Sequence, residues 1–354
     1  MPESCQHLTT GKNDKVVNDG VPRTIGPGLP RRALLLSSLA AVVAGNSSCS
    51  TDRARGQMSL NPDRTWGAFL PPVTSTGHLP FTSIERLASL AGAKPHFVQL
   101  FAATEDSLPV GTLDLILGSG ATPILTLEPW RPDKGHIQSE YALSTIANGR
   151  HDLVLSRWAT ELAAWPHRIL LRFAQEMNGS WYPWSIGVNN NTAAEYRAAW
   201  SRMHSIVSDR APQVRFVWAP NAITAGTRDF TDCYPGDDVV DYLGLDGYNW
   251  GQSPGHHWQS ADKLFSRSLS ALQLLSPGRP ILITEVGCVE GARPDMKAHW
   301  IEDFFRVIER HPDVLGFLWF QMDKERDWRF NSMPASIMSF RDELARWLSG
   351  SRSR

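Results

Sequence analysis

Three glutamates of this 354-residue chain stand at or just beyond the ends of short apolar segments, where side chains could do chemistry. They are Glu128, Glu176 and Glu285. A carboxylate at the mouth of an apolar strand is poorly hydrated, so even a purely structural one needs a partner. Two such groups placed opposite each other can cleave a glycosidic bond. One protonates the leaving oxygen, and the other attacks or stabilises the oxocarbenium-like carbon.

Tryptophan is unusually frequent, with 14 residues against 14 phenylalanines and only 6 tyrosines. Extra indoles can simply fill a core. Their flat apolar faces also suit a ligand with apolar faces and a polar rim, such as a sugar ring. Trp130 and Trp184 lie close to the candidate glutamates in the sequence, and we therefore include them among the expected substrate contacts.

The sequence pattern predicts that eight apolar strands, alternating with helices, position these residues. The expected strands are 66–70, 96–101, 123–127, 168–173, 214–218, 241–245, 280–284 and 314–320. The expected helices between most of them include 83–91, 151–164, 192–208, 261–275, 294–310 and 336–348. Continuous apolar strands indicate a parallel sheet covered by helices. The pattern predicts an α/β protein with a single (β/α)₈ TIM barrel. A doubly wound sheet is the alternative, but no glycine-rich loop follows the first strand.

In such a barrel the active site forms at the C-terminal ends of the strands. The fourth and seventh strands face each other across the barrel, which favours Glu176 with Glu285 over Glu128 with Glu176. The two-residue strand period gives Glu285 the same face as Ile281 and Ile283.

Two charged residues join this group by the same period. Arg172 and Ala174 share a face with Glu176 on the fourth strand, and Asp246 is inward at the end of the sixth. We expect Asp246 to be an ionic partner of Arg172 or a substrate contact.

Three segments that carry these residues resemble motifs of glycoside hydrolase family 26, the family of bacterial β-mannanases. The segments are residues 171–184, 241–249 and 281–287. Three motifs in this order make the resemblance specific, and it extends over roughly residues 64–348. It implies a (β/α)₈ fold and cleavage with net retention of anomeric configuration.

The resemblance also implies roles for individual residues. Glu176 would be the general acid/base and Glu285 the nucleophile. Tyr248 would hydrogen-bond the nucleophile, Trp319 would form the floor of the −1 sugar subsite, and Trp181 would line the cleft.

Two positions of the fourth-strand motif bear on this comparison. Arg172 matches the family's arginine and would help to keep Glu285 ionised. Gln175 stands where the family usually has histidine, and related families carry an asparagine at that step. An amide keeps a contact to a sugar hydroxyl possible and leaves the choice of β-glycan open.

Residues 1–58 are expected to be an export signal and polar linker, and residues 59–350 the catalytic domain. Arg31 and Arg32 precede an apolar run at 33–44, which is shorter than the about 20 residues that span a bilayer. The pair resembles a twin-arginine signal, and a Sec signal is the alternative. A buried helix is the competing interpretation of the run. The protein would be secreted, or lipid-anchored at Cys49.

Composition excludes several other classes. With 35 basic and 36 acidic residues the net charge is −1, so no field attracts nucleic acid. The 4 cysteines contain no C-x-x-C pair, and the adjacent His256 and His257 point apart on a regular backbone. We expect no metal, no cofactor, no transmembrane segment, a monomer, and separate thiols at Cys233 and Cys288.

These observations predict a retaining hydrolase that acts on a β-1,4-mannan-type polysaccharide or its oligosaccharides. A β-glucanase or a β-1,3-xylanase on the same scaffold stays open, as does a catalytically silent sugar-binding barrel. The intact set of Glu176, Glu285 and Tyr248 argues against the silent barrel. Residues 327–329 either bind distal sugars or brace their loop.

Overall fold

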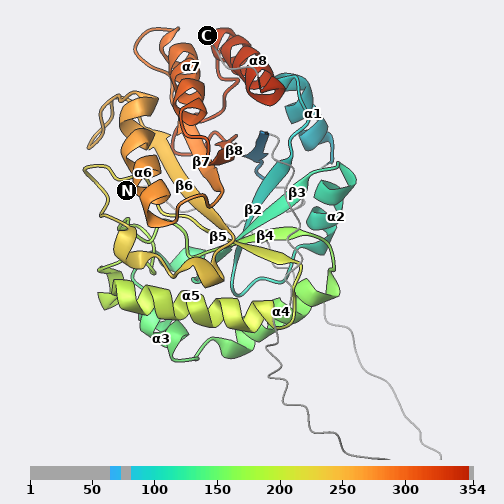
Figure 1. The fold of residues 1–354 in the computed structure, drawn as a ribbon, viewed down its shortest axis with the longest axis vertical. Coiled ribbons are helices and arrows are strands. Elements are labelled where there is room, and N and C mark those ends of the chain that lie inside the picture. Colours follow the sequence, from blue (N-terminus) through green and yellow to red (C-terminus); the bar gives the residue numbers. More distant parts are fainter. Residues whose placement is uncertain (1–63, 73–80, 351–354) are drawn as a thin grey trace, which may run out of the picture. The chain divides into compact units, whose positions relative to one another are not determined.

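The structure is a computed structural model that describes residues 64–72 and 81–350. In it, eight parallel strands close into a barrel in chain order, from β1 to β8, with helices around them (Figure 1). This confirms the predicted (β/α)₈ architecture. Arg31, Arg32, Cys49 and the expected boundary between residues 58 and 59 lie outside the described residues.

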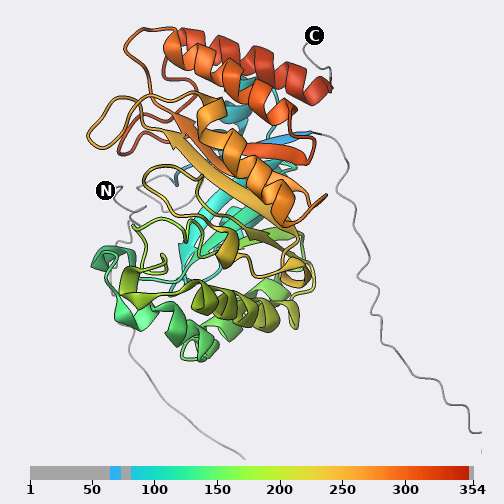
Figure 2. The same ribbon diagram turned by 60° about the vertical axis from the view of Figure 1, so that its left-hand side comes forward.

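The strands and the helices between them alternate along the described part of the chain. The strands are β1 (Thr65–Phe69), β2 (Phe97–Ala103), β3 (Thr122–Glu128), β4 (Ile169–Phe173), β5 (Val214–Trp218), β6 (Tyr242–Asn249), β7 (Ile281–Cys288) and β8 (Val314–Phe320). The helices are α1 (Phe81–Ala91), α2 (Val110–Gly118), α3 (Leu143–Ala147), α4 (Asp152–Ala164), α5 (Ala193–Ser208), α6 (Ala261–Leu275), α7 (Met296–Glu309) and α8 (Pro334–Ser349). In both views α4 and α5 cover the side of the barrel opposite to α7 and α8 (Figures 1 and 2).

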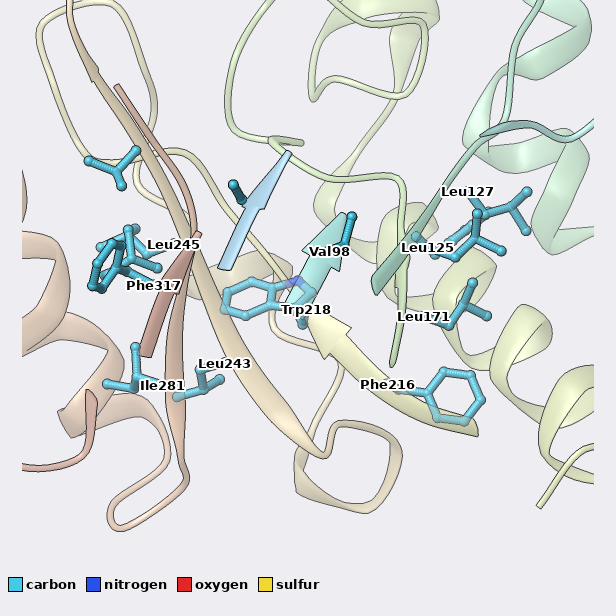
Figure 3. Close-up of a cluster of buried hydrophobic side chains, with 14 of the residues drawn as sticks. Val98, Leu125, Leu127, Leu171, Phe216, Trp218, Leu243, Leu245, Ile281 and Phe317 are labelled. Carbon is cyan, nitrogen blue, oxygen red and sulfur yellow. The ribbon is translucent and has the colours of Figure 1, made fainter. Parts of the chain in front are cut away.

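The main hydrophobic core lies between the strands and the helices. Leu171 and Phe173 of β4 belong to it, and Phe173 packs against Trp200 of α5 with 6.3 Å between ring centroids. Figure 3 shows part of this layer, including Leu125, Leu171 and Phe317. Arg172, between the two apolar β4 residues, reaches β6 and β7 across the barrel interior. Both faces of the strands are buried, and for this reason their sequences are apolar runs. A few polar side chains, such as Arg172, lie in the barrel interior.

The structure differs from the expected elements chiefly where strands end. β6 and β7 continue to Asn249 and Cys288, beyond the predicted ends at 245 and 284. Their polar and glycine residues do not read as strand, but pairing between the two strands continues through them. The helices α2 and α3 were not predicted, because α2 is apolar on most sides and α3 is barely longer than one turn.

β7 contains an irregularity that changes the face of Glu285. Leu245 pairs with Ile283, but the next β6 residue, Asp246, pairs with Glu285 and skips Thr284. Ile281 and Ile283 pack in the outer core, whereas Glu285 reaches Arg172 inside the barrel. The predicted shared face of these residues is therefore wrong. An extra residue, as in a β-bulge, turns the carboxylate inward.

Among the helices that the structure describes, none is long and apolar enough to cross a membrane.

Candidate active site

The segment after β4 leaves the strand through two left-handed residues. φ is 45° at Ala174 and 54° at Glu176, a region that residues other than glycine rarely adopt. The alternation of side chains along β4 ends at this turn. Ala174 therefore does not point into the barrel as Arg172 does, and it packs in the hydrophobic core between strands and helices. The same turn brings Glu176 to the pocket and directs Gln175 to β3. Strained backbone of this kind persists where the surrounding structure fixes it, often at functional sites.

Glu176 is 6% exposed and accepts hydrogen bonds on both carboxylate oxygens. Asn221 Nδ2 donates to Oε1 at 2.6 Å, and Trp181 Nε1 donates to Oε2 at 2.7 Å. Burial, and secondly the charge of Glu285, raise the pKa of Glu176 to about 7, although the two donors and Arg172 oppose this shift. Glu176 can therefore hold a proton near neutral pH.

Glu285 has a different environment at 7% exposure. Arg172 donates to its Oε1, and the Tyr248 hydroxyl donates to its Oε2. The guanidinium of Arg172 is fully buried and also donates to Asp246 Oδ2 at 2.6 Å and Thr126 Oγ1 at 2.9 Å. A buried cation and a hydroxyl thus occupy both side-chain oxygens of Glu285.

Asp246 is fully buried and is an ionic partner of Arg172, which settles the choice that strand parity left open. Thr284 Oγ1 donates to its second oxygen at 2.5 Å. Burial is the main cause that raises the pKa of Asp246 well above its ordinary value, and Arg172 opposes it. Asp246 holds Arg172 by this ion pair and is not part of the pocket wall.

A pocket opens over Glu176 and Glu285 at the C-terminal ends of the strands. Other residues in its wall are Phe101, Trp181, Tyr182, Asn221, Thr224, Gly226, Thr227, Tyr248, Trp250, His256, Gln259, Leu264, Phe320, Lys324, Glu325 and Trp328. Trp181 and Tyr248 were among the predicted contacts, and the structure places both here. The wall combines aromatic faces with a few polar groups around two carboxyl groups.

Three predicted contacts lie behind this wall. Trp184 is fully buried and stacks on Tyr182 with centroids 4.3 Å apart, and Trp130 packs edge-on against both rings. Tyr182 reaches the pocket and the two indoles support it. Gln175 is also fully buried and donates to Glu128 Oε1 at 2.7 Å. The prediction that these three touch substrate is corrected. The left-handed turn directs Gln175 to Glu128, and the packing of the two indoles points them away from the pocket.

Trp319 does not form the floor of the pocket. The alternation of β8 from Phe317 onward places its indole on the outer face, where it packs against Trp300 of α7 and Phe340 of α8. Its Nε1 donates to the carbonyl of Trp328 at 2.8 Å. Phe320, one residue further along, and Trp328, in the following loop, line the pocket instead.

The loop of residues 327–329 is braced as expected, and one of its residues lines the pocket. Arg329 Nη2 binds Asp327 Oδ2 at 2.7 Å and braces the loop. Trp328 between them packs edge-on against Tyr248 and Trp250, with centroids 4.9 and 4.7 Å apart. The sequence had marked this segment but could not separate the two roles.

Glu128 is a third buried carboxyl group near the site. It accepts hydrogen bonds from Gln175 Nε2 and, at 3.2 Å, from Trp130 Nε1. Burial raises its pKa to about 7, against the effect of these two donors. At 1% exposure it lies outside the pocket wall, so its position favours the pair of Glu176 and Glu285 as the reacting groups.

Two pocket residues were passed over in the sequence. Asn221 follows β5, and its position at the mouth of the barrel was the available signal. His256 was considered only as a metal ligand, but its ring stacks on Trp250 with centroids 4.9 Å apart. Within the described part of the chain, no group of three side chains could hold a metal ion, and Cys233 and Cys288 are free, buried thiols.

Comparison with known proteins agrees with this geometry. The model of glycosyl hydrolase family 26 matches residues 138–275, a stretch that includes Glu176 and Tyr248. Endoglucanase H of Acetivibrio thermocellus is 34% identical over 273 residues, which is 74% of this chain and 29% of that protein. A mannan endo-1,4-β-mannosidase of Bacillus subtilis is 28% identical over 210 residues, covering 52% of this chain and 53% of the relative.

A solved structure shares the fold. The Bacillus subtilis mannanase man26 superposes with a TM-score of 0.57 at 21% identity, over 80% of this chain and 86% of that one. A closed parallel barrel with two carboxyl groups at the mouths of β4 and β7 defines the structural class. The chain belongs to glycosyl hydrolase family 26. It spans less than a third of the first of these relatives and about half of the second.

Proposed function

We propose that this protein is a retaining glycoside hydrolase that cleaves within β-linked polysaccharides. One observation carries the proposal. Two carboxyl groups share one aromatic-walled pocket, but their hydrogen-bond partners differ. The pKa of Glu176 is raised to about 7 by burial and by the charge of Glu285. Glu285 accepts hydrogen bonds from Arg172 and Tyr248. Pairs of carboxyl groups with such different surroundings divide the roles of acid and nucleophile.

The reaction would proceed in two displacements. Glu285 attacks the anomeric carbon while Glu176 gives its proton to the leaving oxygen, which forms a glycosyl-enzyme ester and breaks the glycosidic bond. Glu176, now ionised, takes a proton from water, and that water hydrolyses the ester. Arg172 and the Tyr248 hydroxyl hold Glu285 before attack. Trp328 and Trp250 offer faces on which a pyranose ring can rest.

We propose a β-1,4-mannan-type polysaccharide as the substrate. The Bacillus mannosidase and the superposed mannanase support it by their names. A β-glucan is the second candidate, because the relative with 34% identity is an endoglucanase by name. Gln175, in place of the family's usual histidine, lies behind the wall. Substrate choice therefore rests with pocket residues such as Trp328 and His256.

The test measures release of reducing sugar from mannan, galactomannan, mixed-linkage β-glucan and β-1,3-xylan. We expect mannan or galactomannan to be cleaved fastest, and Glu285→Ala to release nothing. Fastest cleavage of β-glucan would support the second candidate. Binding of a polysaccharide without release from any of them would identify a silent sugar-binding barrel and refute the proposal.

We also propose that the protein is exported, on the basis of Arg31, Arg32 and the apolar run at 33–44. Replacement of both arginines by lysine should block export if the signal is of the twin-arginine type. Unchanged export of that variant would favour a Sec signal, and retention of the wild type in the cytoplasm would contradict export.

A further inference from the structure

Asn178 lies two residues after Glu176 in the β4–α5 loop and is 1% exposed. Its side chain holds both backbone polar atoms of one other residue, Asn221. Oδ1 accepts from the Asn221 amide at 2.8 Å, and Nδ2 donates to the Asn221 carbonyl, also at 2.8 Å. Nδ2 donates in addition to the carbonyl of Arg228 at 2.9 Å. One carboxamide thereby fixes the backbone of Asn221 from two directions.

The side chain of Asn221 in turn contacts Glu176. It donates from Nδ2 to Glu176 Oε1 at 2.6 Å. Asn221 follows β5 and bridges to Asp246 of β6, so its backbone is fixed on that side as well. The chain of contacts therefore begins and ends in one loop, running from Asn178 to Asn221 and back to Glu176.

We propose that Asn178 is a positioning residue for the general acid, which clamps the backbone of Asn221 so that its amide donates to Glu176. This inference rests on the proposed function, in which Glu176 is the acid. Asn178 itself lies behind the pocket wall and does not touch substrate. It acts only through Asn221.

The clamp has a defined electrostatic consequence. A hydrogen bond donated to a carboxylate favours the ionised form, so the Asn221 donor lowers the pKa of Glu176, against the effect of burial. The charged or titratable groups that face Glu176 are Glu285 of β7, Arg172 of β4, and Asp246 and Tyr248 of β6. None of them contacts Asn178 in the hydrogen bonds of the described residues. A change at Asn178 should therefore alter the Asn221 contribution and leave theirs in place.

The experiment compares the pH dependence of kcat/KM for the wild type, Asn178→Ala, Asn221→Ala and the double variant. The alkaline limb reports loss of the proton from the acid in the free enzyme. We expect it to move to higher pH by about 0.5 to 1 unit in each single variant. The double variant should move no further than Asn221→Ala, because Asn178 acts through that residue.

Asn191→Ala is the matched control. Asn191 is a buried asparagine of the same loop whose side chain also bonds to backbone atoms, at Leu143, Pro183 and Ser185, but it does not contact Asn221. The Asn191→Ala variant should lower the melting temperature, as Asn178→Ala does, but should leave the alkaline limb of the kcat/KM profile in place. A shift of equal size in Asn191→Ala would overturn the proposal, as would an unchanged limb in Asn178→Ala.

Asn178→Ser decides the question if Asn178→Ala does not fold. Its hydroxyl is too short to hold both Asn221 atoms, so the limb should still move upward, and an unmoved limb contradicts the clamp. Failure of the proposed function is seen separately. In that case the wild type itself cleaves no polysaccharide, whereas failure of the clamp leaves an active wild type whose profile Asn178 does not influence.

Discussion

At the scale of single residues, Glu176 and Glu285 are distinguished by their partners. Asn221 and Trp181 give Glu176 neutral donors, whereas Arg172 gives Glu285 a buried cation. A neutral donor favours the anion only modestly, so burial dominates at Glu176. A hydrogen bond from a guanidinium fully removed from water is charge-assisted and stronger. The roles of acid and nucleophile follow from this difference.

Glu176→Ala and Glu285→Ala should therefore lose activity in different ways. Loss of the nucleophile should abolish turnover of every substrate. Loss of the acid should lower kcat on polysaccharide by about 100- to 10,000-fold. On aryl glycosides the same loss should lower the rate of the first step far less, because a good leaving group needs little protonation. Burst and steady-state kinetics on both substrate types measure this. Equal losses on both types in the two variants would contradict the assignment.

Glu128 should make the protein less stable as the pH rises. Burial raises its pKa to about 7 in the folded state, from the ordinary 4.5 of the unfolded chain. The folded state thus binds the proton more tightly. The stabilisation is complete below about pH 4.5 and is lost as the pH rises through about 7. The shift corresponds to about 3 kcal/mol.

Urea unfolding of the wild type and of Glu128→Gln between pH 4 and 8 tests this. Glu176 adds a similar pH dependence to both proteins, so their difference reports Glu128. The free energy of unfolding of Glu128→Gln should fall less steeply with pH. Parallel curves for the two proteins would show that Glu128 keeps an ordinary pKa.

At the scale of elements, the sequence located the strands well and the faces of their ends poorly. The bounds of β5, β8 and α6 agree with the predicted ones, because apolar runs and helical periods are continuous there. Glu285 was predicted correctly as an inward group but for the wrong reason, since the irregularity of β7 is invisible in a regular period. Trp319 was assigned to the pocket although the alternation of its strand from Phe317 onward points it outward.

The β8–α8 loop shows why some pocket residues could not be predicted. Trp328 reaches the wall because a buried lysine of α7 holds the loop. Lys297 Nζ donates to the Arg329 carbonyl and to Ser332 Oγ, at 2.5 and 2.7 Å, and to the Asp327 carbonyl at 3.5 Å. Such a contact between distant segments leaves no local pattern in the sequence.

Lys297→Met should consequently weaken both folding and substrate binding. It leaves buried carbonyls without a donor, which costs about 1 to 3 kcal/mol in the free energy of unfolding. Because Trp328 loses its anchor, KM should rise several-fold while kcat changes less. Urea unfolding and steady-state kinetics measure the two effects, with Lys263→Met on the exposed face of α6 as the control. An unchanged KM in a folded Lys297→Met protein would show that Trp328 holds its place without the lysine.

At the scale of the whole molecule, the closed barrel brings β4 and β7 to one mouth. This arrangement follows from eight parallel strands paired in chain order, which the repeated strand–helix pattern was enough to predict. Arg172 of β4 contacts Glu285 of β7 directly, so these two side chains together span the barrel interior between the strands. Both Glu176 and Glu285 line the same pocket.

We predict that these two carboxyl groups cleave with retention of anomeric configuration. Retaining enzymes hold the two groups about 5 to 5.5 Å apart, which leaves no room for a water molecule between nucleophile and sugar, whereas inverting enzymes separate them by roughly 6.5 to 9.5 Å. Early-time proton NMR of the cleavage products should therefore show the β-anomer first, with the α-anomer rising only by mutarotation. A second measurement traps the intermediate. A fluorinated glycoside with a good leaving group should label Glu285, and Glu285→Ala should remain unlabelled. First appearance of the α-anomer would instead require a water molecule between Glu285 and the sugar, and would contradict the double displacement.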